Sequence, residues 1–251
     1  MNKQREFLQL AKDISKCNAC LNMHTVPHRI NSECLENDSH GLETEHPYVN
    51  LWNLWHGNLD ADIMVIGQDF GVRENAIVFT EKQKSKNYTN PTDVALRDLF
   101  KETFDIDVDD ENASLFFTNM ANCYRKQKST GGMHCGWLPI CANKYMGRLI
   151  QIVQPKMIIV LGQTAFNAMF CLDGLTVECN NPDEKGNNTF GNVIQYEHQI
   201  KINDSVIHVF PVYHPGANSK RNRSTEEQKQ DWMRMKSYYQ KGINNDQTSS
   251  T

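Results

Sequence analysis

The chain has 251 residues, of which 39% are hydrophobic and 22% charged, a composition typical of a globular protein with a sizeable core. Its net charge of −4 excludes a uniformly basic nucleic-acid-binding protein, so any such site has to be a local basic patch. No apolar run reaches the roughly 18 residues of a membrane-spanning helix. The charged N-terminus lacks the apolar core of a signal peptide, so we expect a cytoplasmic, monomeric protein without a membrane partner.

The first predicted elements surround a long irregular segment. Residues 1–16 have the apolar spacing of an amphipathic helix, whereas residues 21–60 lack clear periodicity and are expected to form a surface excursion. The apolar run at 62–66 predicts a buried strand that ends in a glycine. Asn90 followed by Pro91 predicts the start of a helix, because proline suits the first helical turn.

Strands alternate with helices along the rest of the chain, which predicts an α/β fold with a central, mostly parallel, four-stranded sheet, helices on both faces and an added hairpin or extension. We expect one domain over residues 1–241 and a disordered tail at 242–251. The remaining predicted elements are a strand at 114–118, a helix at 138–153, a strand at 156–161, a short helix at 164–170, a loop at 171–191, strands at 193–202 and 206–212, and a helix at 224–240.

Three of the predicted strands end in polar residues. Gln68 and Asp69 follow the first, Asn119 follows the second, and His214 follows the last. Each alone has an ordinary interpretation as a turn or loop residue. Because the carboxyl ends of parallel strands meet at one edge of a sheet, we expect these side chains to lie together. A carboxylate, an amide and an imidazole can activate water, read a planar heterocycle and stabilise an oxyanion.

Basic residues follow the same three strand ends. In an acidic chain, positive charge along one edge predicts a bound polyanion, most simply a nucleic-acid backbone. The ordinary alternative is three solvated loops. The residues are Lys82, Lys84 and Lys86, then Arg125, Lys126 and Lys128, then Lys220, Arg221 and Arg223.

Eight cysteines are many for a chain in a reducing compartment, where metal ligands or buried thiols are better interpretations than disulfides. Cys17 and Cys20 form a C-x-x-C pair after the first helix. Cys123, Cys135 and Cys141 form a second group later in the chain.

Four short motifs in order resemble those of the uracil-DNA glycosylase superfamily, over roughly residues 10–225. GQDFG at 67–71 is similar to the first motif, FFTN at 116–119 to the strand that ends in a base-reading Asn, and YHPGA at 213–217 to the His-Pro motif. The run from Cys141 through QPKMIIVLG is similar to the iron–sulfur branch. The first motif is divergent, because Phe and Gly stand where the superfamily's uracil enzymes have Pro-Tyr, and the iron–sulfur branch usually lacks the Asp.

The resemblance implies a role for four cysteines. In the iron–sulfur branch a C-x-x-C near the N-terminus joins two later cysteines, and the matching positions are Cys17, Cys20, Cys123 and Cys141. Four thiolates can hold a 4Fe–4S cluster. Zinc is the chemical alternative, since it also binds four cysteines. Cys135 is a possible substitute for Cys123 or Cys141.

The resemblance also implies hydrolysis of the N-glycosidic bond between deoxyribose and a damaged base, usually uracil. The substrate is single- or double-stranded DNA, and the base has to be flipped out of a duplex before attack. Asn119 would pair with the base, Asp69 would orient or deprotonate water, and His214 would donate a hydrogen bond to the leaving base.

Further contacts are implied around the same motifs. Tyr88 is the expected aromatic that stacks on the base, with Phe70 and Phe79 as alternatives. At the base we also expect Gly67, Gln68, Phe70 and Gly71, and on the DNA Arg125, Lys126, Asn218, Ser219, Lys220, Arg221 and Arg223.

The competing hypothesis is a non-catalytic DNA- or nucleotide-binding protein of the same fold that carries a structural metal cluster. Asp69, Asn119 and His214 favour the enzyme, because a pure binding protein has no need of all three. A Rossmann-type nucleotide enzyme ranks lower, since Gly67 and Gly71 do not form a G-x-G-x-x-G pattern.

Overall fold

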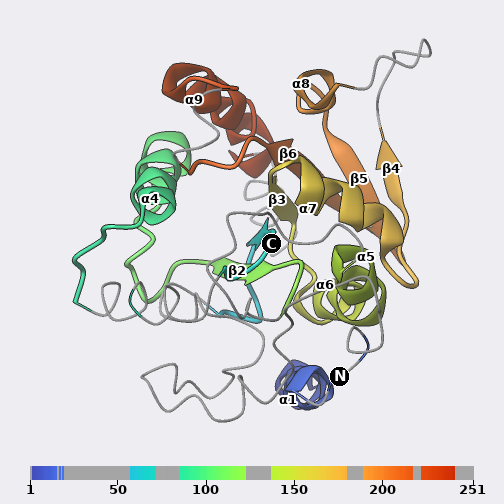
Figure 1. The fold of residues 1–251 in the computed structure, drawn as a ribbon. Helices are drawn as coiled ribbons and strands as arrows, with labels where there is room; N and C mark the ends of the chain where they lie inside the picture. The colour runs from blue at the N-terminus through green and yellow to red at the C-terminus, as the bar shows by residue number, and fades with distance from the viewer. Residues whose placement is uncertain are drawn as a thin grey trace, which may run out of the picture.

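A six-stranded sheet forms the centre of the protein (Figure 1), with the strand order β2-β1-β3-β6-β5-β4. The computed structural model describes residues 2–15, 17, 19, 57–71, 78, 85–122, 137–179, 189–216 and 222–240. The first four strands of this order run parallel, and β5 and β4 add to them antiparallel. The strands are β1 (Ile63–Gly67), β2 (Leu115–Asn119), β3 (Met157–Leu161), β4 (Val177–Cys179), β5 (His198–Ile202) and β6 (Ser205–Val212). The predicted α/β class with four parallel strands is confirmed, and the complete sheet is larger than four strands.

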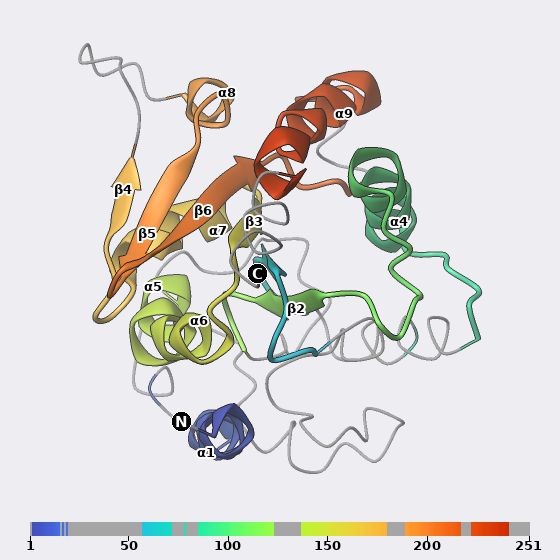
Figure 2. The ribbon, with the colours of Figure 1, turned by 180° about the vertical axis from the view of Figure 1, so that it is seen from behind.

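Helices cover both faces of the sheet, as the two opposite views show (Figures 1 and 2). Successive side chains of β1 point to opposite faces, so Ile63 and Val65 pack in one hydrophobic cluster and Met64 and Ile66 in the other. One face carries α4 (Pro91–Phe104) and α9 (Thr225–Met233); the other carries α1 (Lys3–Ser15), α5 (Trp137–Cys141), α6 (Gly147–Val153) and α7 (Gln163–Ala168), which continues as η3 (Met169–Cys171). Because both faces of the sheet are buried, the sequences of its central strands are unbroken runs of apolar residues.

The starts of α4 and α9 follow from local capping chemistry. The Asn90 side chain accepts a hydrogen bond from the Thr92 backbone N–H, and Pro91 occupies the first turn of α4. Ser224 and Glu227 form a reciprocal capping box at the start of α9. Both predicted helix starts are therefore confirmed to within a residue.

The helix predicted at 138–153 differs from a regular α-helix. Between α5 and α6 lies a π-helical segment, η2 (Ala142–Met146), which widens the turn. A Cβ atom on Gly147 would lie 2.6 Å from the backbone oxygen of Asp173, so only glycine permits this close approach. Apolar periodicity predicted that this segment is helical, but it did not predict the wider π-helical turn at η2.

Two sequence predictions near the added strands are wrong. The segment predicted as a loop at 171–191 contains β4, whose three residues pair with β5. The strand predicted at 193–202 begins only at His198, because α8 (Phe190–Val193) and a turn at 194–197 precede it. Phe190 and Ile194 are buried against the core by helical turns, and such short apolar runs fit a helix and a strand equally well.

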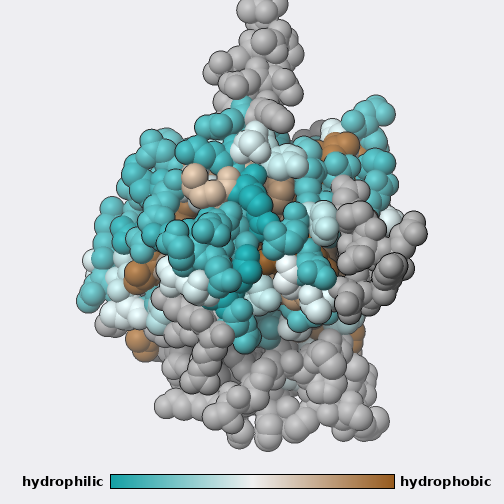
Figure 3. Space-filling model, turned by 90° about the horizontal axis from the view of Figure 1, so that it is seen from above, coloured by the Kyte–Doolittle hydropathy of each residue, from teal (hydrophilic) through white to brown (hydrophobic). Residues whose placement is uncertain are grey.

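The described surface is predominantly polar in the view from above, with hydrophobic side chains occurring singly (Figure 3). Exposed large apolar residues in the described part include Leu8, Phe170 and Met233, which lie on α1, η3 and α9. Isolated apolar residues of this kind are normal on soluble surfaces. None of the described helices is long and apolar enough to cross a membrane.

Candidate active site

Strand register brings the polar strand ends together at the carboxyl edge of the sheet. Gly67 at the end of β1 lies directly beside Asn119 at the end of β2. The Met120 backbone N–H donates to the Gly67 oxygen over 2.8 Å, which continues the pairing beyond the strands. On the other side, Gly162 follows β3, and a Cβ there would lie 3.6 Å from the His214 Cβ. His214 therefore lies beside the end of β3, close enough to the loop after β1 for the charge of Asp69 to act on its ring.

The loop after β1 fixes the Asp69 carboxylate. Its Oδ1 accepts the Gly71 backbone N–H over 2.6 Å, and its Oδ2 accepts the Gln68 side-chain amide over 2.9 Å. Gly71 has a φ of 74°, a left-handed conformation that favours glycine and turns the backbone N–H back onto the carboxylate. The half-buried carboxylate is thus held in one orientation by its own loop.

His214 is held as a hydrogen-bond donor. Its Nδ1 is 3.0 Å from the Gly216 backbone N–H, which donates to it. In the neutral ring the proton then resides on Nε2. Burial lowers the pKa of His214, and the nearby negative charge of Asp69 opposes this shift without cancelling it. With a pKa below its ordinary value, the imidazole is expected to be mainly neutral at pH 7, and its hydrogen is then on Nε2.

Asn119 is the most unusual polar residue of this edge. Its side chain is 1% exposed, and neither its Oδ1 nor its Nδ2 has a hydrogen-bond partner. Leaving a buried polar atom unpaired costs about 1–3 kcal/mol. Two unpaired, buried polar atoms on one amide, at the carboxyl edge of a parallel sheet, are typical of a binding site for a ligand with a matching donor and acceptor.

The two described candidates for a stacking aromatic have different surroundings. Tyr88 donates its hydroxyl hydrogen to Asp109, and the Arg97 guanidinium lies 4.4 Å from its ring centroid. Its phenol is therefore engaged on the α4 side of the sheet. Phe70 follows Asp69 directly and packs, partly buried, against the opposite hydrophobic cluster. The alternative Phe79 lies outside the described residues.

Of the predicted DNA-binding residues, the structure describes only Arg223. Its guanidinium donates to both Asp231 oxygens, over 2.9 and 2.6 Å, and to Glu227 over 3.5 Å. The Asp231 side chain is 2% exposed and also pairs with Arg234. Arg223 therefore holds the start of α9 through an ion pair with the buried Asp231. From its charge alone we expected it to face the DNA. Arg125, Lys126, Asn218, Ser219, Lys220 and Arg221 lie outside the described residues.

Two of the four predicted metal ligands are described. Cys17 follows α1 and is half-buried, and Cys141 ends α5 and is buried; neither is in a disulfide. Both contact the same hydrophobic cluster, which is compatible with thiolates that converge between these helices. Cys20, Cys123 and Cys135 lie outside the described residues. Within the described part, no group of three or more His, Cys, Asp or Glu residues could hold a metal ion.

Two residues near the site, Thr92 and Asn122, carried no sequence signal that singled them out. Gly216 and Thr92 are neighbours, since a Cβ on Gly216 would lie 3.1 Å from Thr92 Oγ1. Asn122 is 1% exposed, and its Oδ1 has no hydrogen-bond partner. Its spacing of three residues from Asn119 was the only available hint, and that spacing acquires meaning only through the fold.

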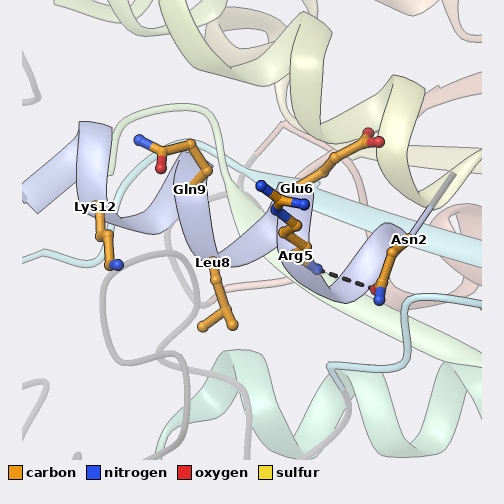
Figure 4. A pocket seen from close by; sticks show the side chains of 6 residues that line it. All are labelled: Asn2, Arg5, Glu6, Leu8, Gln9 and Lys12. Atoms are coloured by element: carbon orange, nitrogen blue, oxygen red, sulfur yellow. Dashed lines mark hydrogen bonds between the residues drawn. The ribbon is translucent and has the colours of Figure 1, made fainter.

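Two hollows lie elsewhere on the described surface. One, of about 600 Å³, follows a polar face of α1 with mixed charges (Figure 4). The other, of about 390 Å³, lies between α9 and β6. Its charged groups are Asp231 and Arg234, which pair with each other, and Glu197, which pairs with His208. Charges that pair with each other, or that are of mixed sign, give a hollow no preference for a ligand of one charge. The carboxyl edge of the sheet therefore remains the candidate site. The α1 hollow is lined by Asn2, Arg5, Glu6, Leu8, Gln9 and Lys12.

The fold and the site define an α/β protein with a carboxylate, an amide and a neutral imidazole on the carboxyl edge of its sheet. Residues 54–238 match the sequence model of the uracil DNA glycosylase superfamily, and the chain belongs to this superfamily. The matched region includes all three strand-end motifs. No curated protein matches the chain.

Proposed function

We propose that this protein is a DNA glycosylase that hydrolyses the N-glycosidic bond of uracil, or of a related deaminated base, in DNA. The unpaired, buried amide of Asn119 carries the proposal. A flipped uracil offers N3–H as a donor and O4 as an acceptor on one edge. Asn119 can satisfy both through its Oδ1 and Nδ2, whereas cytosine presents the opposite polarity at these positions.

The charges that develop during cleavage match the neighbouring groups. As the bond to the base breaks, the sugar becomes positive and the base negative. The Asp69 carboxylate stabilises the sugar and accepts a proton from the attacking water. The Nε2–H of neutral His214 donates to the O2 of the leaving base and stabilises its negative charge. The bond between Gly216 and Nδ1 supports this assignment of the donor.

The base and the DNA backbone need further contacts. Gly67, Gln68 and Gly71 surround Asp69 and would border the base, with Phe70 as the stacking ring. The engagement of Tyr88 with Arg97 and Asp109 favours Phe70 over it. We assign phosphate contacts to Arg125, Lys126, Asn218, Ser219, Lys220 and Arg221, which flank the second and third motifs.

A metal centre held by Cys17, Cys20, Cys123 and Cys141 is part of the proposal. The half-buried and buried thiols of Cys17 and Cys141, packed on one cluster, suit a 4Fe–4S centre, with zinc as the alternative. Bound there, the group would supply a structural crosslink rather than a reactant. The four cysteines would thereby tie the end of α1 to α5 and to the chain after β2.

Excision from a panel of oligonucleotides tests the proposal. We expect release of uracil, or of one of hypoxanthine, xanthine and mismatched thymine, in single-turnover assays. Asp69→Asn should slow release on the order of 100-fold or more, while Asp110→Asn, on an exposed loop, should leave it unchanged. DNA binding without release of any of these bases would instead support the non-catalytic protein.

A further inference from the structure

The chain after β2 continues alongside the start of the loop that carries Asp69. The backbone N–H groups of Met120 and Ala121 donate to the oxygens of Gly67 and Gln68, over 2.8 and 3.0 Å. Consecutive N–H groups of a regular strand point in opposite directions, so the backbone bends here. Asn122 is the next residue of this segment, one position beyond Ala121, which pairs with Gln68.

Asn122 has an unpaired acceptor in this position. The residue is 1% exposed, and its Oδ1 has no hydrogen-bond partner. With both amide atoms of Asn119, three unpaired buried polar atoms lie within four residues at the end of one strand. Such a concentration is uncommon in native proteins, where buried polar atoms are almost always paired.

A count of donors indicates what the second acceptor binds. Uracil, thymine and hypoxanthine each retain a single ring N–H once attached to deoxyribose, and the Asn119 Oδ1 accepts it. Once Asn119 has accepted that N–H, these bases have no further ring N–H that a second side-chain oxygen of the protein could accept. The attacking water has two hydrogens, of which Asp69 accepts one. We propose, on the basis of the proposed glycosylase function, that Asn122 Oδ1 accepts the other and fixes the orientation of this water.

The step balances without a further reactant. The water oxygen forms a bond to C1′ as the bond from C1′ to the base nitrogen breaks, and the electron pair of that bond leaves with the base. One water proton passes to Asp69 and the other remains on the new hydroxyl group, donated to Asn122. The base anion then takes a proton from solvent. Asn122 thereby aims the water lone pair at C1′.

Competition between water and methanol tests the proposal. Methanol has a single O–H hydrogen, so a site with two acceptors favours water over it. In Asn122→Leu, which removes the acceptor at similar volume, we expect release to slow about 10- to 100-fold. The ratio of methyl deoxyriboside to hydrolysis product should rise. Asn122→Asp retains acceptor oxygens and should keep a ratio closer to that of the native protein.

The outcomes separate this role from its alternatives. An unchanged product ratio in a folded Asn122→Leu protein overturns the proposal, whatever the rate. A slowing confined to xanthine, the base on the panel with a second ring N–H, would assign Asn122 to base reading instead. If Asn122→Leu does not fold, an unchanged ratio in Asn122→Ser overturns the proposal. Absence of release by the native protein would contradict the glycosylase function itself, and exposed Asn167→Leu serves as the matched control.

Discussion

The backbone N–H of Gly216 donates a hydrogen bond of 3.0 Å to Nδ1 of His214, two residues earlier in the chain. This short loop sets the tautomer of the ring without any other side chain. A Cβ on Gly216 would lie 2.9 Å from Nδ1 and 3.1 Å from Cε1 of the same ring. The orientation of the proposed donor thus depends on the absence of a side chain at position 216.

Gly216→Ala should therefore displace the imidazole. The added methyl group would lie 2.9 Å from Nδ1 of the ring and 3.1 Å from Thr92 Oγ1, so the ring, Thr92 or both must shift. We expect base release to slow by about 10-fold or more in single-turnover assays, as for a misplaced catalytic group. Gly191→Ala is the matched control, because its Cβ meets Tyr213 only at an ordinary 3.7 Å. Equal rates for the two variants would contradict the role assigned to the loop.

The pH dependence of release follows from the direction of the His214 shift. Burial lowers the pKa of His214, so the ring stays neutral as the pH falls through the ordinary histidine value of about 6.5. We expect the acid loss of activity that belongs to His214 to begin only below that pH. Removing the charge in Asp69→Asn should lower the pKa of His214 further, because Asp69 favours the charged ring. Nitrogen-15 NMR of the labelled imidazole measures both effects, and a pKa above 6.5 would contradict the lowering that we attribute to burial.

Asn119→Asp tests base reading at nearly constant side-chain volume. The carboxylate replaces the amide donor with an acceptor, which faces the O4 acceptor of uracil. We expect uracil release to fall on the order of 100-fold, since an interaction with the base becomes repulsive. Asn167→Asp, exposed on α7, should have no effect. Similar losses for both variants would point to instability rather than recognition.

The salt dependence of DNA binding separates Arg223 from its neighbours. Lys220→Ala and Arg221→Ala should each reduce the slope of log affinity against log salt by about 1. Arg223→Ala should leave the slope unchanged and lower the melting temperature, because its guanidinium pairs with the buried Asp231. Fluorescence anisotropy and thermal unfolding provide the two measurements. A reduced salt slope in Arg223→Ala would instead indicate that Arg223 contacts the DNA.

The metal proposal predicts a coloured protein that loses its colour with its ligands. Protein purified without oxygen should be brown, with about four iron atoms for each chain, as expected for a 4Fe–4S cluster. Cys17→Ser and Cys141→Ser should each reduce the iron content, whereas Cys179→Ser, exposed on β4, should not. Colourless protein that contains zinc would favour the alternative metal. Absence of both metals would leave the four cysteines as thiols.

Apolar periodicity predicted much of the fold. The runs at 62–66, 114–118 and 156–161 correspond to β1, β2 and β3, because strands buried on both faces must be continuously apolar. The same reasoning missed β4 and α8, which are three and four residues long. Such short elements are stabilised by neighbours rather than by their own pattern, so the local sequence does not specify them.

The sequence by itself determined the parallel sheet, the order of the motifs, and the presence of a carboxylate, an amide and an imidazole at three strand ends. Only the tertiary structure decided the surroundings of these groups. It leaves the Asn119 amide unpaired, directs the Gly216 backbone N–H to Nδ1 of His214, and turns Arg223 inward to Asp231. The physical reason is that burial and hydrogen-bond partners depend on residues far apart in the chain, whereas periodicity reports only local neighbours.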